Sequence, residues 1–216
     1  MVKRKVGAVV LVLVASVAVA AGAVGGVQEA ARLDDGEIRA ILDGIHGKRG
    51  MMNVPRVDGE FLHDFIIERG YKRGLEIGTS NGYSAIWMGM ALRKTGGKLV
   101  TLEIDKRRAS LARENFARVK LGEVIELREG DALEIIPELS GPFDFVFIDA
   151  WKPDYIRYFE MIYPKVRAGG AIFAHNVLSH GSEMRDFLEM IENHPDLETW
   201  IERRSRAGIS VSVKGR

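Results

Sequence analysis

Short apolar runs recur along the chain at intervals typical of a sheet whose strands are joined by helices. Five of them lie at 74–78, 98–104, 124–130, 143–149 and 170–175, and the segments between them show the spacing of helices. These runs are continuous rather than alternating, which indicates strands buried on both faces. We therefore predict a doubly wound α/β fold, with a mostly parallel sheet between two layers of helices.

Two further runs, at 197–202 and 209–213, predict two more strands. The second alternates apolar and polar residues, as an antiparallel strand at or near the edge of a sheet does. Residues 106–120 carry apolar side chains on one face and cations on the other, which predicts a helix covering the sheet. Residues 28–50 read as a linker followed by a weakly amphipathic helix.

The first thirty residues have a different character. Three of the first five residues are cations, and no charge follows from Val6 to Val27. Such a segment is long enough for a membrane span and also suits a signal peptide, and both interpretations remain open. The acids that follow predict that the domain is exported or faces outward. We divide the chain into a leader or anchor at 1–27, the linker and helix at 28–50, and the main domain at 51–216.

Composition narrows the range of partners. The chain is 46% hydrophobic and 28% charged, with a formal net charge of +1, which is ordinary for a globular domain. The near-neutral charge gives no basic surface for nucleic acid, so we expect a small-molecule partner and no nucleic acid. Cysteine is absent, which excludes disulfides, thiolate metal sites and cysteine nucleophiles.

A glycine loop follows the first run. Gly78 and Gly82 permit a tight turn and a close approach to a ligand at the start of a helix. Glu103 ends the next run and is placed to reach ribose hydroxyls. The loop is not the pyrophosphate-binding G-x-G-x-x-G, and Glu76 before it would repel phosphates. A nucleoside with a cationic amino-acid group, such as S-adenosylmethionine, suits it, with Gly130-Asp131-Ala132 near the adenine.

Several stretches match a known family in order and spacing. They are MNVPRVDGEFL (52–62), GLEIGTSNGYSA (74–85), TLEID (101–105), GDA (130–132), FIDAWKPDY (147–155) and GGAIFAHNVL (169–178). Together they resemble the class I metal-dependent O-methyltransferases of the catechol and caffeoyl-coenzyme A type. The resemblance covers nearly everything after residue 50, so the main domain is expected to be a methyltransferase domain. It implies a Rossmann-like, seven-stranded, mostly parallel sheet with one antiparallel strand.

The resemblance also implies roles for individual residues. The implied contacts of S-adenosylmethionine are Val54, Glu76, Gly78, Ser84, Glu103, Ala132 and Asp149. The implied divalent-metal ligands are Asp149, His175 and Asn176. Lys152 corresponds to the general base, with Asp149 as its catalytic neighbour, and Trp151 to a wall of the acceptor pocket. A metal at Asp149 would help to ionise and orient the acceptor hydroxyl, and Lys152 would take its proton.

One position departs from the family pattern. The family usually has an aspartate where this chain has His175, and an imidazole favours a transition metal such as manganese over magnesium. A metal-independent transfer that uses His175 as the base is the alternative. The family's late acidic residue has no assignable counterpart, because the stretch at 203–206 holds three arginines and a serine. This disfavours catechol itself and suits an acidic acceptor.

The expected function is methyl transfer to a hydroxyl of a small, aromatic, phenolic acceptor. Two rival functions stay open: a nicotinamide-dependent oxidoreductase, which the glycine spacing disfavours, and a catalytically inactive module that binds S-adenosylmethionine. Membrane anchoring through residues 6–27 and a homodimer are further expectations.

Overall fold

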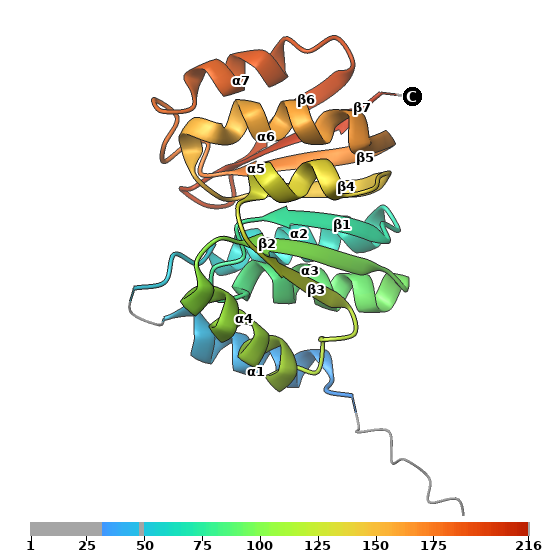
Figure 1. Cartoon of the computed structure of the whole chain (residues 1–216), viewed down its shortest axis with the longest axis vertical. Helices are drawn as coiled ribbons and strands as arrows, with labels where there is room; N and C mark the ends of the chain where they lie inside the picture. Colours follow the sequence, from blue (N-terminus) through green and yellow to red (C-terminus); the bar gives the residue numbers. More distant parts are fainter. Residues whose placement is uncertain (1–31, 48–49, 216) are drawn as a thin grey trace, which may run out of the picture. The chain divides into compact units, whose positions relative to one another are not determined.

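A computed structural model describes residues 32–47 and 50–215 of the chain (Figure 1). The leader or anchor predicted for residues 1–27 lies outside these residues. Residues from Arg32 onward form one compact unit. None of its described helices combines the length and apolar character needed to cross a bilayer.

The predicted doubly wound fold is confirmed. The described residues contain one seven-stranded sheet with the order β3-β2-β1-β4-β5-β7-β6, in which β7 alone runs against its neighbours. The strands are β1 (Arg73–Ile77), β2 (Lys98–Glu103), β3 (Ile125–Glu129), β4 (Phe143–Ile148), β5 (Val166–His175), β6 (Leu197–Glu202) and β7 (Ile209–Lys214). The predicted antiparallel strand is thus β7, which lies next to the edge strand β6.

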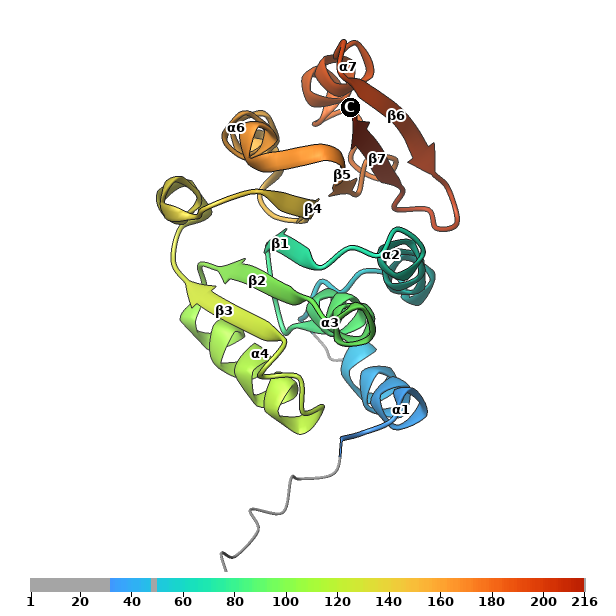
Figure 2. The same cartoon turned by 90° about the vertical axis from the view of Figure 1, so that its right-hand side faces the viewer.

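Helices cover both faces of this sheet (Figure 2). On one face lie α1 (Asp35–His46), α2 (Arg56–Glu68), α3 (Tyr83–Thr95) and α4 (Lys106–Arg118), and on the other α5 (Ala132–Ile135), α6 (Tyr155–Ile162) and α7 (Arg185–Glu192). Short 3-10 turns η1 (Ile136–Glu138), η2 (Lys152–Asp154) and η3 (Tyr163–Lys165) join some of them. The order of elements therefore gives a three-layer sandwich, as the apolar runs predicted.

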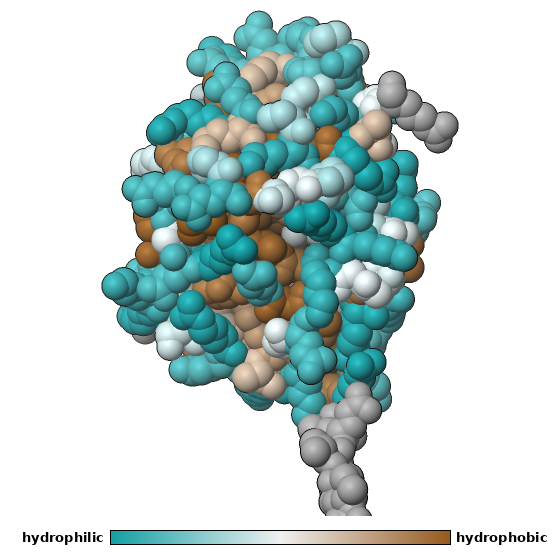
Figure 3. Space-filling model, turned by 45° about the vertical axis from the view of Figure 1, so that its right-hand side comes forward, coloured by the Kyte–Doolittle hydropathy of each residue, from teal (hydrophilic) through white to brown (hydrophobic). Residues whose placement is uncertain are grey.

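Each face of the sheet has its own apolar cluster. Phe145 and Phe147 of β4 pack with the first helix layer, whereas Val146 and Ile148 pack with the second. This alternation is what a strand buried on both faces requires. The face drawn in Figure 3 is mostly hydrophilic, apart from an apolar area near its middle.

Strand β5 starts four residues earlier than the predicted run. Its first residue, Val166, pairs with Phe143, but Ala171 pairs with Phe145, so the register shifts between them. Gly169 has a φ of +73° in this stretch. The irregular part contains Arg167, Ala168 and two glycines, which together carry no strand signal, and this explains the missed boundary.

Candidate active site

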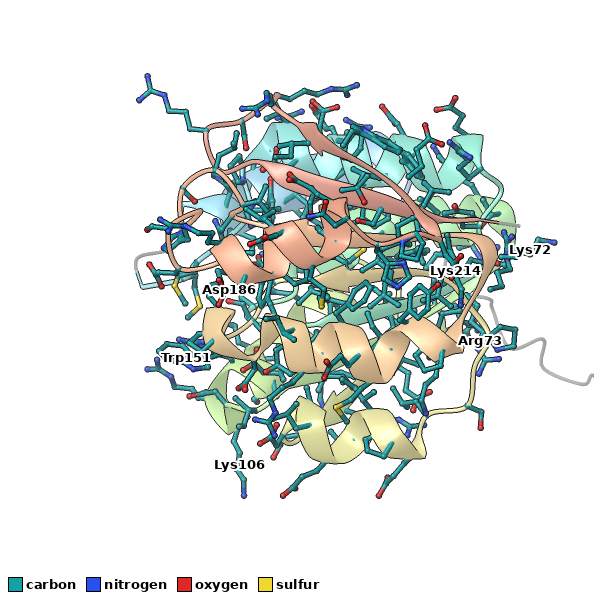
Figure 4. All side chains as sticks on the ribbon, turned by 90° about the horizontal axis from the view of Figure 1, so that it is seen from above. Lys72, Arg73, Lys106, Trp151, Asp186 and Lys214 are labelled. Carbon is teal, nitrogen blue, oxygen red and sulfur yellow. The ribbon has the colours of Figure 1, made fainter. Side chains whose placement is uncertain are left out.

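The carboxyl ends of the central parallel strands meet at one edge of the sheet. Ile77 of β1 lies beside Leu102 of β2 and Ile148 of β4, and Ile148 lies beside Ala174 of β5. The predicted site residues Glu76, Glu103, Asp149 and His175 stand at or beside these ends. Trp151, which follows β4, lies at the end of the domain opposite Lys72, Arg73 and Lys214 (Figure 4). The structure therefore brings these predicted residues to one rim, around the switch in strand order between β1 and β4.

The glycine loop joins β1 to α3 and packs against the end of β4. Gly78 has a φ of +102°, and a Cβ there would lie 2.1 Å from the carbonyl oxygen of Asp149. The N–H groups of Gly78 and Thr79 both donate to the Leu102 carbonyl, at 3.0 and 3.1 Å. The Ser80 N–H donates to Glu103 Oε2 at 2.6 Å. Because these amides are satisfied internally, this part of the loop offers no phosphate cradle, in agreement with the absence of the G-x-G-x-x-G pattern.

Glu76 is a fully buried carboxylate with no cationic partner among the described residues. Its oxygens accept hydrogen bonds from the hydroxyls of Ser84 and Thr101, each at 2.5 Å. Burial raises the pKa of Glu76 to about 8, and the two hydroxyls only partly offset this effect. This part of the site is therefore suited to a ligand that brings a positive charge.

Glu103, at the end of β2, stabilises two loops by hydrogen bonds. It is 5% exposed, and its oxygens accept from the backbone N–H groups of Ser80 and Asp105, at 2.6 and 2.9 Å. An ionised carboxylate has about four lone-pair positions. Glu103 thus keeps acceptor capacity for the hydroxyls of a ligand while it holds both loops.

Asp149 stands between two basic side chains. Lys152 Nζ lies 3.2 Å from Oδ1, and His175 Nδ1 lies 3.3 Å from Oδ2. Lys152 Nζ also donates to the Ala150 carbonyl at 3.2 Å and to the Tyr155 hydroxyl at 2.9 Å. Burial alone would raise the pKa of Asp149, but His175 and Lys152 outweigh it and lower the pKa. This carboxylate is therefore ionised in the free protein.

His175 is held from its other side by a residue that the sequence did not single out. Its Nε2 lies 2.9 Å from Oδ2 of Asp58, a residue of α2 that is 1% exposed. Burial alone would lower the pKa of His175, but Asp149 and Asp58 outweigh it and raise the pKa to about 9. Nδ1 makes no hydrogen bond within the described part of the chain, because its contact with Asp149 has ion-pair distance without hydrogen-bond alignment.

The other predicted residues lie in varied surroundings. Val54 and Ala132 are 2% and 8% exposed, and the Ser84 hydroxyl is engaged by Glu76. Trp151 is 69% exposed, so it is not part of the core. Asn176 follows His175 directly and has a φ of +65°.

The side chains around Asp149 bear on whether a divalent metal could bind. Among the described residues, no three His, Cys, Asp or Glu side chains form a metal cluster. The predicted ligand set therefore needs the side-chain amide of Asn176 in addition to Asp149 and His175. Two features fit a metal: the buried Nδ1 faces a carboxylate without a hydrogen bond, and Nε2 is bound by a second carboxylate, as in many metal-binding histidines. The donor chemistry fits a cation here, and metal binding stays a prediction.

A separate cleft lies away from these strand ends. It has a volume of about 760 Å³ and is lined by Arg69, Tyr71, Arg167 and Lys214, among others. Two of its cations have structural partners: Arg167 pairs with Asp144, and Lys214 donates to the carbonyls of η3 and β5. It contains none of the predicted site residues, so the strand ends remain the candidate site.

Comparison with known proteins identifies the family of this chain. A family model described as O-methyltransferase matches residues 38–200. Catechol O-methyltransferase of Niastella koreensis is 45% identical over 134 residues, 60% of this chain and 60% of that protein. Caffeoyl-CoA O-methyltransferase 2 of Zea mays is 33% identical over 138 residues, 61% of this chain and 52% of that protein. This chain therefore spans little more than half the length of these relatives.

A solved structure is similar over a larger share. The O-methyltransferase of Bacillus cereus, solved in complex with SAH, is 30% identical with a TM-score of 0.72, and the match covers 83% of this chain and 89% of that one. The resemblance seen in the sequence motifs is confirmed by these matches.

Proposed function

Because this chain belongs to the O-methyltransferase family, we propose that it transfers a methyl group from S-adenosylmethionine to a hydroxyl of a small phenolic acceptor. One observation carries the proposal: two carboxylates lie near each other at one edge of the sheet. The buried Glu76 has no cationic partner among the described residues, whereas Asp149 has two, His175 and Lys152. The first suits a cationic cofactor, and the second suits an acceptor whose hydroxyl must be ionised.

The cofactor half of the site is built on β1 and β2. Glu76 would face the positively charged methionine end of S-adenosylmethionine, and Glu103 would accept from its ribose hydroxyls. The SAH in the Bacillus cereus relative supports this choice. Val54, Gly78, Ser84 and Ala132 would complete the pocket, with Ser84 acting through its hydrogen bond to Glu76.

The acceptor half is built on the ends of β4 and β5. The names of the relatives point to phenolic acceptors such as catechol and caffeoyl-CoA. The exposed indole of Trp151 offers an apolar wall for an aromatic ring at the mouth of this half. The exposed cations at Arg203 and Arg206, on the loop after β6, would favour an acceptor with an acidic group.

Methyl transfer needs a deprotonated acceptor oxygen in line with the sulfonium methyl carbon. That oxygen forms the new C–O bond while the C–S bond breaks, giving a methyl ether, S-adenosylhomocysteine and one proton. Lys152 Nζ lies 3.2 Å from Asp149 Oδ1 and can receive this proton if its amine is unprotonated before the step. Holding both reactants at one strand edge supplies the orientation on which the rate depends.

A divalent cation, when bound, would lower the pKa of the acceptor hydroxyl. Asp149, His175 and Asn176 are the residues that would hold it. His175 must then be neutral, so metal binding would weaken as the pH falls below the His175 pKa. The same raised pKa bears on the metal-independent alternative: a histidine that is already protonated at neutral pH serves as a cation rather than as a base.

The proposal is tested with the purified full chain, labelled S-adenosylmethionine and a panel of phenols, first with chelator and then with single divalent ions added back. Asp149→Ala should lower turnover at least about 100-fold while cofactor affinity stays within about tenfold, or 1.4 kcal/mol. Asp186→Ala, an exposed aspartate on the same side of the domain as Trp151 (Figure 4), is the control and should match the wild type. Full activity of Asp149→Ala refutes the assigned role, and cofactor binding without turnover on any phenol supports the inactive module.

A further inference from the structure

Asp58 is an acidic residue on the apolar face of α2. Phe61, Leu62 and Phe65 follow it at spacings of three, four and seven residues, and all four side chains are buried. These spacings define the face of a helix that packs on a core. A carboxylate in such a position costs free energy unless it is paired and hydrogen-bonded. Its partners therefore show why it is there.

Within the described part of the chain, Asp58 has two side-chain partners, and both bind the same oxygen. His175 Nε2 lies 2.9 Å and Ser205 Oγ 2.7 Å from Oδ2. Ser205 Oγ in turn accepts from the N–H groups of Ala207 and Gly208, at 3.1 and 3.3 Å. The carboxylate thus joins α2, the end of β5 and the loop between β6 and β7 at a single point.

We infer that Asp58 is a positioning residue that acts through His175, an inference that rests on the function proposed above. Asp58 holds the Nε2–H and so fixes the ring with Nδ1 turned toward Asp149 Oδ2, 3.3 Å away. With the ring fixed in this way, Nδ1 would present a proton to the acceptor half when the imidazole is protonated. It would present a lone pair when the imidazole binds a metal. Ser205 keeps the carboxylate in its orientation without competing for the ring.

The surroundings of His175 leave few other groups to set its orientation and charge. Asp58 faces it from α2 and Asp149 from the end of β4, with Lys152 on the far oxygen of Asp149. Within His175, the Tyr155 hydroxyl of α6 contacts the backbone carbonyl, at 3.4 Å, rather than the ring, and the Phe147 ring lies 6.1 Å from the imidazole. Asp58 is therefore the one group hydrogen-bonded to the ring among the described residues.

The same helix supplies a matched control. His63 and Asp64 form a second histidine–aspartate pair on α2, with Nδ1 and Oδ1 2.7 Å apart. Here the aspartate is 69% exposed, and the ring packs near Trp87 rather than at a strand end. Asp64→Asn changes the same chemical pair without touching the candidate site.

The experiment compares Asp58→Asn, Asp58→Ala and Asp64→Asn in the full chain. The asparagine at position 58 would keep an amide oxygen for Nε2–H but lose the charge, whereas alanine removes both. We expect kcat/KM to fall about 10-fold for D58N and about 100-fold for D58A, the range seen when the outer partner of a ligand histidine is lost. Cofactor affinity should stay within about twofold, and D64N should match the wild type in both measurements.

A second readout follows the ring itself, by NMR of histidine labelled with ¹⁵N. In the wild type we expect the His175 Nε2 to carry a proton that is hydrogen-bonded to Asp58 Oδ2. In D58N the Nε2 signal should shift because its hydrogen bond to a carboxylate is lost, and in D58A the proton should distribute between the two nitrogens. D64N should leave these signals unchanged.

Each outcome decides the inference. Unchanged kcat/KM and unchanged His175 signals in D58N overturn it, as does a loss of cofactor affinity equal to the loss of kcat/KM, which would indicate a packing role. If D58A does not fold, D58N alone decides. If the wild type methylates no acceptor, the proposed function fails, and the His175 signals then decide the role of Asp58 by themselves.

Discussion

Glu76 and Asp149 occupy similar places and respond to burial in opposite ways. Both carboxylates stand at the ends of adjacent strands, β1 and β4, and both are largely removed from water. Burial raises the pKa of Glu76 to about 8 because only hydroxyls contact it. Asp149 has His175 and Lys152 beside it, and its pKa is lowered despite its burial. Position in the fold therefore does not set the charge state; the neighbouring side chains do.

This difference divides the candidate site into two halves with different needs. The half at β1 lacks a cation among the described residues until a ligand brings one, whereas the half at β4 and β5 carries its cations in the chain. In the proposed function, a cofactor with positive sulfonium and ammonium groups would supply the cation that the first half lacks. In the proposed reaction, the second half would stabilise an acceptor oxygen that becomes negative.

The largest effect is expected where the two halves touch. Gly78→Ala would place a Cβ 2.1 Å from the Asp149 carbonyl oxygen, at a φ of +102°. The backbone of β1 and β4 must separate to accept it, so we expect a loss of roughly 3 kcal/mol in the free energy of unfolding, from strain and overpacking together. Urea denaturation measures the loss, and calorimetry should show weaker cofactor binding.

Gly96→Ala is the matched control for that experiment. Gly96 also has a positive φ, +74°, but a Cβ there meets no atom within 4 Å among the described residues. It should lose only about 1 kcal/mol, from the left-handed backbone alone. Equal losses for the two variants would mean that contact between the strand ends contributes nothing.

The next test exchanges each carboxylate for its amide. Glu76 is protonated in the folded protein up to about pH 8 but ionises near 4.5 when unfolded, so the folded state binds more protons between these values and stability falls as the pH rises through them. Glu76→Gln should therefore raise the free energy of unfolding at pH 7.5 by roughly 2 kcal/mol in the absence of cofactor, while weakening cofactor binding at least about 10-fold.

Asp149→Asn should act in the opposite direction. The lowered pKa of Asp149 contributes stability above its unfolded value of 3.8, and the neutral amide leaves His175 and Lys152 without their shared partner. We expect a loss of roughly 2 kcal/mol at pH 7.5. Urea denaturation of both variants at one pH measures the contrast. Changes of the same sign would show that the two halves are not distinct.

The sequence predicted the strand-end acids because they follow buried apolar runs, and parallel strands end at one edge. Glu76, Glu103 and Asp149 could be found in that way. Their opposite charge states could not be predicted from the sequence. The partners of Asp149 include His175, which lies in another strand and comes close only through the register of β4 and β5.

Asp58 was missed although a signal existed. It is separated from His175 by 117 residues, and it lies within a stretch that was noted for its resemblance rather than for its pattern. Its place on the apolar face of α2, in line with Phe61 and Phe65, marks it as a buried acid in need of a partner. Ser205 gives no such signal, because its role depends on how the loop after β6 folds back.

The smallest effect concerns the pH dependence of cofactor affinity. Glu76 is mainly protonated at pH 7 in the free protein, because burial raises its pKa, with Asp149 and Glu103 adding to that effect and Ser84 and Thr101 opposing it. A cationic cofactor favours the ionised form of Glu76, so binding must release a proton. The affinity should therefore rise with pH by up to about tenfold per unit below pH 8 and level off above it.

Calorimetry in buffers of different ionisation enthalpy counts the proton released. Glu76→Gln should flatten the profile, whereas Asp64→Asn should preserve it; a wild-type profile that is flat from about pH 6 to 8 would show that the cofactor's charge does not meet Glu76.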